Sequence, residues 1–337
     1  MYKPQEIPIP LLRLLAYKRN LPPNHPAQPK LDDEIGRYIS GYFGEKSIDY
    51  FISLIPNQNI SSIHSLRIPL NGNHFQMDTL LKTNKYLTII EIKNHTGDIE
   101  IDHDFGTMTQ NESTSYEDPI NQVERQADQL KTWLQQNGYP PVPIESLVLF
   151  TNKNIRLLRS GPVEIDPRII SVYRFSHKFS EILKKYHTAP TYPELNNIIS
   201  HLIKINVPFD DSELFNKIGL TKKDFIPGVK CTKCPFSIME RIYGTWQCPT
   251  CKQTDKQAHV LQLKDYYLIF GSNITNRQAR YWLKCSQHHI VYHLLKTSGL
   301  KELYKNKNRV YRMNFDFQKD FIYLLEYNKR SFENLNR

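Results

Sequence analysis

Residues 74–94 read HFQMDTLLKTNKYLTIIEIKN and carry the pattern that decides the fold. Two runs of strand-forming residues predict two adjacent β-strands. In the second run, an extended backbone places Glu91 and Lys93 on one face, about 6.6 Å apart along the strand. Ile90 and Ile92 face the opposite way. Because an isolated ion in a buried strand costs several kcal/mol, the pattern predicts partners for these two charges.

The first run contributes a second carboxylate, Asp78, which strand alternation places on one side with Gln76 and Leu80. If the two strands pair as a hairpin-like unit, Asp78 lies close to Glu91. Two carboxylates on neighbouring strands form an oxygen-rich site for a hard cation, Mg²⁺ or Mn²⁺. Lys93 can then hold a water for attack on a phosphodiester, whose developing charge the metal stabilises. The alternative is that the two acids are salt-bridged or at strand ends and that Lys93 is solvated.

The composition is that of a globular protein of two or three domains. The chain has 337 residues, of which 39% are hydrophobic and 23% charged. The apolar N-terminal run is broken by prolines and Arg13, and no run approaches the ~20 residues that span a bilayer. We therefore expect a cytoplasmic protein without a membrane partner. In that compartment the five cysteines are expected to be ligands or free thiols rather than disulfides.

The net charge of +10 is unevenly distributed. Residues 31–150 contain 17 Asp and Glu against eight Lys and Arg, whereas residues 270–313 contain nine basic residues and one acid. A small, strongly basic segment is typical of a polyanion binder. The acidic front needs cations before nucleic acid can approach it. The charges therefore indicate a metal-holding first part and a nucleic-acid-binding last part.

The remaining pattern predicts an α/β core of order α-β-β-β-α-β, with two helices covering a mixed sheet. Asp118 is the predicted N-cap of the second helix, Pro119 its first residue and Gly138 its end. The predicted elements are a helix (31–55), three strands (62–70, 74–83 and 85–94), an acidic polar loop (98–118), a helix (118–138) and two further strands (146–150 and 169–173).

Four blocks of this region resemble the nuclease-related domain family, NERD, of the PD-(D/E)xK nuclease superfamily. The blocks are GYFGEKSIDYF, FQMDTLL, TIIEIKNHTGD and DPINQVERQADQL. The resemblance covers residues 31–151 and implies a restriction-endonuclease-like fold with nuclease activity. One departure is Met77, which precedes Asp78 where the superfamily motif has proline.

The resemblance also implies roles for individual residues. It implies that Asp78, Glu91 and Lys93 are catalytic and that the two acids bind Mg²⁺ or Mn²⁺. It adds Glu45 on the first helix as a further acid and places Gln122 of the later helix toward the site. From the residues alone, Glu45 and Gln122 are equally compatible with solvent-facing positions on amphipathic helices.

Four cysteines predict a structural zinc site. They form two Cys-x2-Cys pairs separated by thirteen residues, and four thiolates complete the tetrahedral shell of Zn²⁺. Such a closed site performs no catalysis and stabilises a module too small to fold alone. The alternative is free thiols or redox pairs, and the fifth cysteine, Cys285, is predicted to be a small buried residue. The predicted ligands are Cys231, Cys234, Cys248 and Cys251.

Residues 275–313 predict two short helices followed by a basic hairpin. Thr275 can cap the first helix, which carries Ala279 and Leu283, and Ser286 can cap the second. This order resembles a winged helix-turn-helix, whose second helix enters the major groove of DNA while the hairpin contacts phosphates. The alternative is a winged helix that binds protein.

The second helix predicts an apolar and a polar face. The apolar residues expected inside are Ile290, Val291, Leu294 and Leu295. The polar face and the hairpin supply the DNA-contacting residues that we expect, namely Arg277, Arg280, Gln287, His288, His289, Tyr292, His293, Lys296, Lys305, Lys307 and Arg309. A zinc ribbon followed by such a module is also similar to the organisation of Gram-positive bacterial NERD proteins.

Together these patterns predict a metal-dependent DNA nuclease that a winged helix targets to double-stranded DNA. The alternatives are a non-catalytic DNA-binding or regulatory protein that keeps the nuclease fold, and an interaction scaffold. The predicted domains are an extended arm (1–30), a nuclease-like domain (31–173), a helical connector (174–226), a zinc ribbon (227–260), a winged helix-turn-helix (261–314) and a C-terminal segment (315–337).

Overall fold

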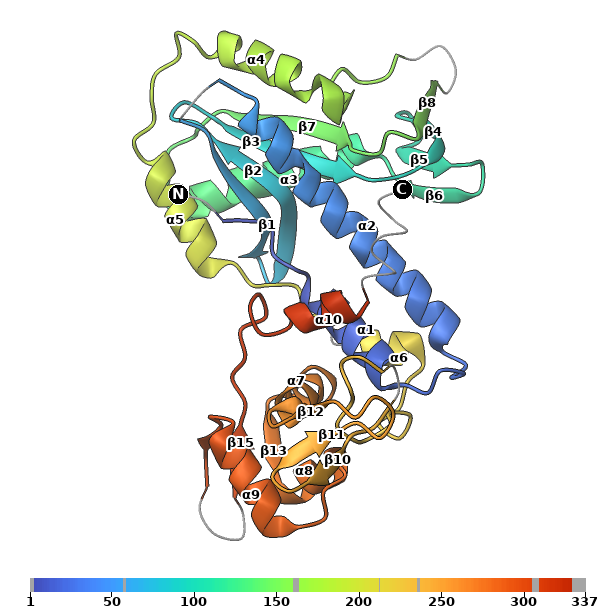
Figure 1. The fold of residues 1–337 in the computed structure, drawn as a ribbon. Coiled ribbons are helices and arrows are strands. Elements are labelled where there is room, and N and C mark those ends of the chain that lie inside the picture. Colours follow the sequence, from blue (N-terminus) through green and yellow to red (C-terminus); the bar gives the residue numbers. More distant parts are fainter. Residues whose placement is uncertain are drawn as a thin grey trace. The chain divides into compact units, whose positions relative to one another are not determined.

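The chain folds into two compact units, each of which is built from two separate segments of the sequence (Figure 1). Unit 1 contains residues 1–6 and 40–209, and unit 2 contains residues 7–39 and 210–337. The chain therefore passes between the units three times. The computed structural model describes residues 3–56, 59–159, 164–211, 213–234, 237–304 and 309–328.

Unit 1 is built on a five-stranded mixed sheet of order β1-β2-β3-β7-β9. Strands β1 (Ser61–Leu70), β2 (Asn73–Lys82) and β3 (Leu87–Lys93) are antiparallel neighbours. Strands β7 (Ile144–Phe150) and β9 (Ile169–Ser171) continue the sheet in parallel. These strands confirm the predicted ones, including the hairpin-like pairing of β2 with β3.

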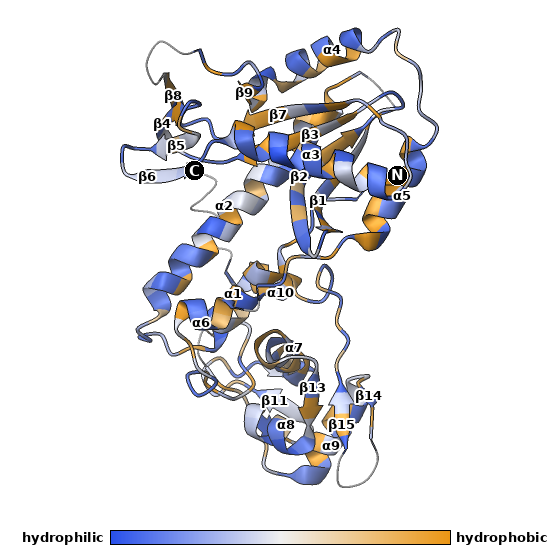
Figure 2. Cartoon of the chain, turned by 180° about the vertical axis from the view of Figure 1, so that it is seen from behind, coloured by the Kyte–Doolittle hydropathy of each residue, from blue (hydrophilic) through white to orange (hydrophobic). Residues whose placement is uncertain are grey.

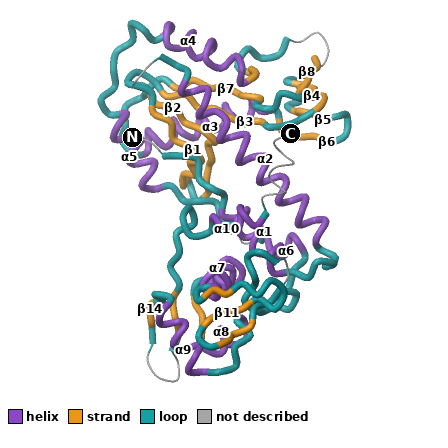
Figure 3. The backbone as a smooth tube through the Cα atoms, viewed as in Figure 1, coloured by secondary structure: helices purple, strands orange, loops and turns teal. Residues whose placement is uncertain are grey.

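Helices cover both faces of this sheet, as the tube in Figure 3 shows. Helices α3 (Pro119–Gln136) and α5 (Leu195–Ile205) pack on one face. The second half of α2 (Gln28–Ser53) and α4 (Phe175–Lys185) pack on the other. Strands β3 and β7 are largely hydrophobic between these layers (Figure 2), as expected of strands covered on both faces.

Helix α3 begins and ends where the sequence predicts. The Asp118 carboxylate accepts a hydrogen bond from the Ile120 N–H at 2.8 Å, and Pro119 is the first helical residue. Gly138 follows the helix with φ +72°, a left-handed conformation that glycine adopts without strain. The N-cap, the proline and the terminating glycine are all confirmed.

The expectation of a polar loop over 98–118 is wrong. This segment forms β4 (Gly97–Asp102), β5 (Thr107–Gln110) and β6 (Thr114–Glu117), which join β8 (Ile155–Arg159) in a second sheet of order β6-β5-β4-β8. Short strands with one buried side alternate apolar with polar residues, and the many acids hid this alternation. The side chains that bury this sheet against the core are Ile99, Ile101 and Met108.

The expectation of an extended arm over 1–30 is also wrong for its middle part. Residues Ile9–Asn20 form helix α1, which contacts α7 (Ala258–Phe270) and α10 (Ile322–Tyr327) inside unit 2. Pro10 is tolerated because the N–H groups of a helix's first turn need no partner within the helix. The leucines of α1 are buried and supply part of the core of this unit.

Unit 2 contains two small three-stranded sheets. The first joins β10 (Glu240–Ile242), β11 (Thr245–Gln247) and β12 (Thr254–Asp255) and lies beside the four cysteines in sequence. The second has the order β13-β15-β14. Along the chain, its strands and the neighbouring helices follow in the order α7, β13 (Asn273–Thr275), α8 (Asn276–Trp282), α9 (His288–Thr297), β14 (Lys301–Glu302) and β15 (Val310–Arg312).

A buried ion pair ties α1 to α7 in unit 2. The side chains of Arg19 and Asp265 are 1% and 0% exposed and form a salt bridge. Asp265 also accepts hydrogen bonds from Asn20 Nδ2 at 2.8 Å and from the Tyr323 hydroxyl at 2.6 Å. The Arg19 guanidinium lies 5.6 Å from the centre of the Tyr323 ring. Each charge therefore has several partners, as buried ions require.

Candidate active site

The predicted acids meet where β2 runs beside β3. Continuing the register by one position places Asp78 opposite Glu91, and Asp78 Oδ2 accepts a hydrogen bond from the Ile92 N–H at 2.9 Å. Burial, together with the nearby carboxylates of Glu91 and Glu45, raises the pKa of Asp78 well above its usual value. Three acids from different elements therefore share one electrostatic environment.

Glu91 and Lys93, the two charges on β3, are each other's partners. Glu91 is only 3% exposed. Lys93 Nζ donates to Glu91 Oε1 at 2.7 Å and to Gln122 Oε1 at 2.8 Å. Gln126 Nε2 donates to the other oxygen of Glu91 at 2.8 Å. Helix α3 thus supplies two amides to the acid and the base, and the alternative of a merely solvated Lys93 is wrong.

Gln126 was not among the predicted site residues, although a signal for it exists. It lies four residues after Gln122, so both amides project from the same side of α3. Gln126 is 5% exposed and therefore does not belong to a solvent-facing stripe. The solvent-facing alternative is wrong for Gln122, whose Oε1 accepts the hydrogen bond from Lys93.

Glu45 lies on helix α2 and has hydrogen-bond partners on two other segments of the chain. Gln5 Nε2 donates to Glu45 Oε2 at 2.6 Å, and the Ser65 hydroxyl lies 3.3 Å from the same oxygen. Burial, with a smaller contribution from the Glu91 carboxylate, raises the pKa of Glu45 to about 7. Glu45 is therefore part of the acidic cluster, while nothing in the sequence near Gln5 or Ser65 indicated their role.

The predicted alternation of Gln76, Asp78 and Leu80 on one side of β2 is wrong. Gln76 is exposed, whereas Leu80 is fully buried in the same core as Met77. The regular pleat is disturbed at this point because Ser65, which lies opposite Asp78 in the register of β1 and β2, has φ +51°. Non-glycine residues adopt this conformation uncommonly.

The acidic cluster offers carboxylate oxygens, which are the ligands that hard divalent cations prefer. Burial raises the pKa values of Asp78 and Glu45, and a cation bound beside these two carboxyl groups would favour their ionised forms. Asp78 and Glu91 are the residues that could hold such an ion, with Glu45 as the third acid. Lys93 stands beside them, so a phosphate bound at the cluster would meet a metal and an ammonium group together.

The four cysteines of unit 2 converge on one point. Their Sγ atoms all lie within 4.8 Å of one another, and those of Cys231 and Cys251 are 3.7 Å apart. A tetrahedral zinc with Zn–S bonds of about 2.3 Å requires sulfur atoms about 3.8 Å apart. The cluster therefore has the spacing of a four-thiolate metal site. Cys285, separate from the cluster, is buried as predicted.

The helices of the basic segment are mostly placed as predicted. Thr275 caps α8 in a capping box with Gln278, which confirms the first cap. The second predicted cap is wrong by one residue, because Gln287 still has an extended backbone and α9 begins at His288. The buried residues of α9 are Val291, Leu294 and Leu295, and Ile290 is half-buried.

The predicted DNA-contacting side chains divide into two groups. Arg280 and Tyr292 are half-buried, and Arg309 forms a salt bridge with Glu302 and lies 5.0 Å from the centre of the Tyr292 ring. Lys305 and Lys307 lie outside the described residues. The exposed group consists of Arg277, Gln287, His288, His289, His293 and Lys296.

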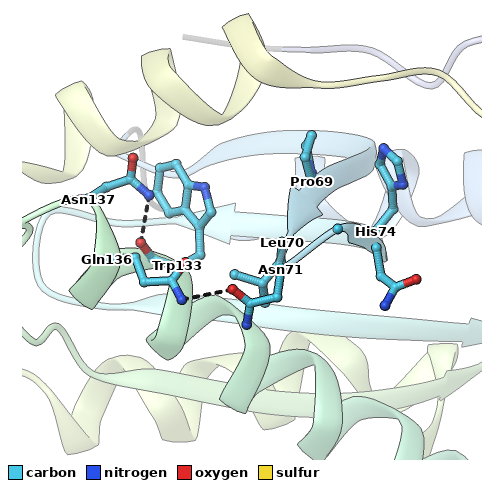
Figure 4. A pocket seen from close by; sticks show the side chains of 9 residues that line it. Pro69, Leu70, Asn71, His74, Trp133, Gln136 and Asn137 are labelled. Carbon is cyan, nitrogen blue, oxygen red and sulfur yellow. Dashed lines mark hydrogen bonds between the residues drawn. The ribbon is translucent and has the colours of Figure 1, made fainter.

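A pocket of about 380 Å³ lies away from the acidic cluster (Figure 4). It is formed by the turn between β1 and β2 and by the end of α3, where Gln136 Nε2 donates to Asn71 Oδ1 at 3.0 Å. It is lined by Pro69, Leu70, Asn71, Gly72, Asn73, His74, Trp133, Gln136 and Asn137, none of which is an acid or a lysine. The pocket therefore offers no carboxylate ligand for a metal ion.

Comparison with known proteins supports the resemblance seen in the sequence. Residues 40–151 match the family model of the nuclease-related domain, NERD. This stretch runs from the middle of α2 to the end of β7 and contains every acid of the cluster. No curated protein and no solved structure matches the chain. Among the helices that the structure describes, none has the length and apolar character to cross a membrane.

Proposed function

We propose that the protein is a metal-dependent nuclease that hydrolyses phosphodiester bonds in DNA. The observation that carries the proposal is the constellation of Asp78, Glu91 and Lys93, locked by Gln122, inside the stretch that matches the nuclease-related domain. Carboxylates beside a fixed ammonium group are suited to metal-assisted attack on a phosphodiester.

The residues divide the chemistry among them. Asp78 and Glu91 would hold Mg²⁺ or Mn²⁺, which when bound neutralises charge on the phosphoryl oxygens. Lys93 Nζ has three donors, of which two go to Glu91 and Gln122. The third is left to orient the attacking water or a phosphate oxygen. Gln126 fixes the second oxygen of Glu91 and so holds the carboxylate in one orientation.

The test is cleavage of linear, nicked and single-stranded DNA with Mg²⁺, with Mn²⁺ and with EDTA. We expect metal-dependent cleavage that falls by about 10³-fold or more in Glu91→Gln, since metal assistance contributes several kcal/mol. Glu100→Gln, an exposed acid on β4, is the matched control and should cleave like the wild type. Equal cleavage by wild type and Glu91→Gln would show a contaminant and remove support for the site.

We further propose that unit 2 binds DNA through a zinc ribbon and a winged helix. The order α7-β13-α8-α9-β14-β15 supports this proposal, in which α9 would be the helix that enters the major groove. The exposed face of α9 carries His289, His293 and Lys296. The four thiolates would hold a structural Zn²⁺, which supplies folding energy rather than chemistry.

DNA affinity measured over a range of salt concentrations tests this surface. A phosphate contact contributes about one unit to the slope of log affinity against log salt. We therefore expect Lys296→Ala to weaken binding and to reduce the slope by about 1. Lys319→Ala, another exposed lysine of unit 2, should change neither. Unaltered binding by Lys296→Ala would favour a protein partner for α9.

The runner-up function is a non-catalytic DNA-binding protein that keeps the nuclease fold. Salt-sensitive DNA binding by wild type and Glu91→Gln alike, without cleavage by either in any metal, would establish it. The interaction-scaffold reading would require that neither cleavage nor DNA binding occurs.

A further inference from the structure

Lys3 is hydrogen-bonded to β1, the edge strand of the unit 1 sheet. The Lys3 N–H donates to the Ser62 carbonyl at 3.3 Å, and the His64 N–H donates to the Lys3 carbonyl at 3.1 Å. Lys3 Nζ also donates to the His64 carbonyl at 2.9 Å, and Lys3 as a whole is 8% exposed. These bonds form a short parallel bridge with β1. Lys3 is thus packed into unit 1, although it lies outside residues 40–151, which match the nuclease-related domain.

The bridge between Lys3 and β1 places Gln5 beside Glu45 of the acidic cluster. Gln5 Nε2 donates to Glu45 Oε2 at 2.6 Å, while the Ser65 hydroxyl lies 2.9 Å from Gln5 Oε1 and 3.3 Å from Glu45 Oε2. The three side chains therefore form a closed triangle of polar contacts. Ser65 makes its two contacts from a left-handed backbone conformation, φ +51°, which a glycine would adopt with less strain.

We propose that Gln5 and Ser65 are positioning residues that orient Glu45 toward the metal, so that the N-terminal segment completes the nuclease site. The inference rests on the proposed metal-dependent function. Gln5 and Ser65 both contact Oε2 of Glu45, which restrains the carboxylate group, and Oε1 would then be the oxygen offered to the metal. Hydrogen bonds of this kind to ligating groups orient them, and their loss typically reduces metal affinity or activity by about 10–100-fold.

Mn²⁺ binding to the full-length protein, followed by calorimetric titration, tests the proposal without relying on cleavage. We expect Gln5→Ala to weaken Mn²⁺ binding by about 10–100-fold. Gln135→Ala, an exposed glutamine of α3, is the matched control and should bind like the wild type. Thermal unfolding without added Mn²⁺ reports separately whether each variant remains folded.

Ser65→Gly separates positioning from a purely structural role. Glycine suits the left-handed backbone, so the metal-free variant should unfold at the same or a higher temperature than the wild type. Positioning nevertheless predicts about tenfold weaker Mn²⁺ binding because the hydroxyl is lost. Wild-type Mn²⁺ affinity in both Gln5→Ala and Ser65→Gly would overturn the inference while leaving the proposed nuclease intact. A wild-type protein that binds no Mn²⁺ would overturn both.

Discussion

Replacing Lys93 with methionine should abolish metal-dependent DNA cleavage while leaving Mn²⁺ binding intact or tighter. Methionine keeps an unbranched side chain but removes the ammonium group that Glu91 and Gln122 hold in place. Loss of a group that orients the attacking water or the phosphate costs several kcal/mol, or about 10³-fold in rate. Loss of a positive charge beside the carboxylates favours the cation, so metal affinity should not fall.

Single-turnover cleavage rates and Mn²⁺ titrations of the same preparations measure the two effects separately. Lys131→Met is the matched control, because Lys131 is 60% exposed on α3 and pairs only with Asp128 among the salt bridges of the described chain. It should leave both quantities unchanged. A Lys93→Met protein that cleaves within tenfold of the wild-type rate would remove Lys93 from the mechanism and leave the carboxylates alone to support it.

Replacing Arg19 with methionine should destabilise unit 2 by about 3–5 kcal/mol, the usual cost of leaving a buried charge without its partner. Asp265, fully buried on α7, would then keep only the hydrogen bonds from Asn20 and Tyr323. Since domains are typically stable by about 5–15 kcal/mol, a large part of the stability of unit 2 would be lost.

Urea unfolding followed by tryptophan fluorescence reports on this change, because Trp246 and Trp282 are buried in unit 2. Arg13→Met, on the same helix, is the matched control. Its salt bridge with Asp210 is partly exposed, so it should cost about 0–1 kcal/mol. Adding Asp265→Asn to Arg19→Met should recover part of the loss. An Arg19→Met cost no larger than that of Arg13→Met would show that the buried pair contributes little.

The elements that could be predicted from the sequence are those with local signals. Helix α3 has a capping aspartate, a first-turn proline, a terminating glycine and a regular apolar face. Strands β2 and β3 are adjacent in sequence and pair as a hairpin. Strands β4 to β6 have only one or two apolar positions each, and β4 and β6 also carry acids, so polarity outweighed their alternation. Helix α1 was missed because its prolines favour an extended chain, whereas a proline in the first turn of a helix is compatible with it.

The same distinction governs the site. Asp78, Glu91 and Lys93 lie within sixteen residues of one another, so strand period and pairing suffice to bring them together. Gln126 follows from helix period once Gln122 is known. Gln5 lies 40 residues from Glu45 in sequence. The bridge between Lys3 and β1 places it there, and no residue pattern predicts that bridge. Contacts of this kind depend on the assembled fold.

Because the chain passes between the units three times, a continuous fragment can contain all of unit 1 without all of unit 2, but the reverse is not possible. A fragment ending at residue 209 keeps every residue of unit 1, including the segment with Gln5. No continuous fragment keeps all of unit 2 without also containing residues 40–209, because helix α1 and Asp265 lie on opposite sides of that stretch. Removing residues from 210 onward therefore keeps all of unit 1 without the basic segment, whereas removing residues 1–209 keeps the basic segment but takes helix α1 out of unit 2.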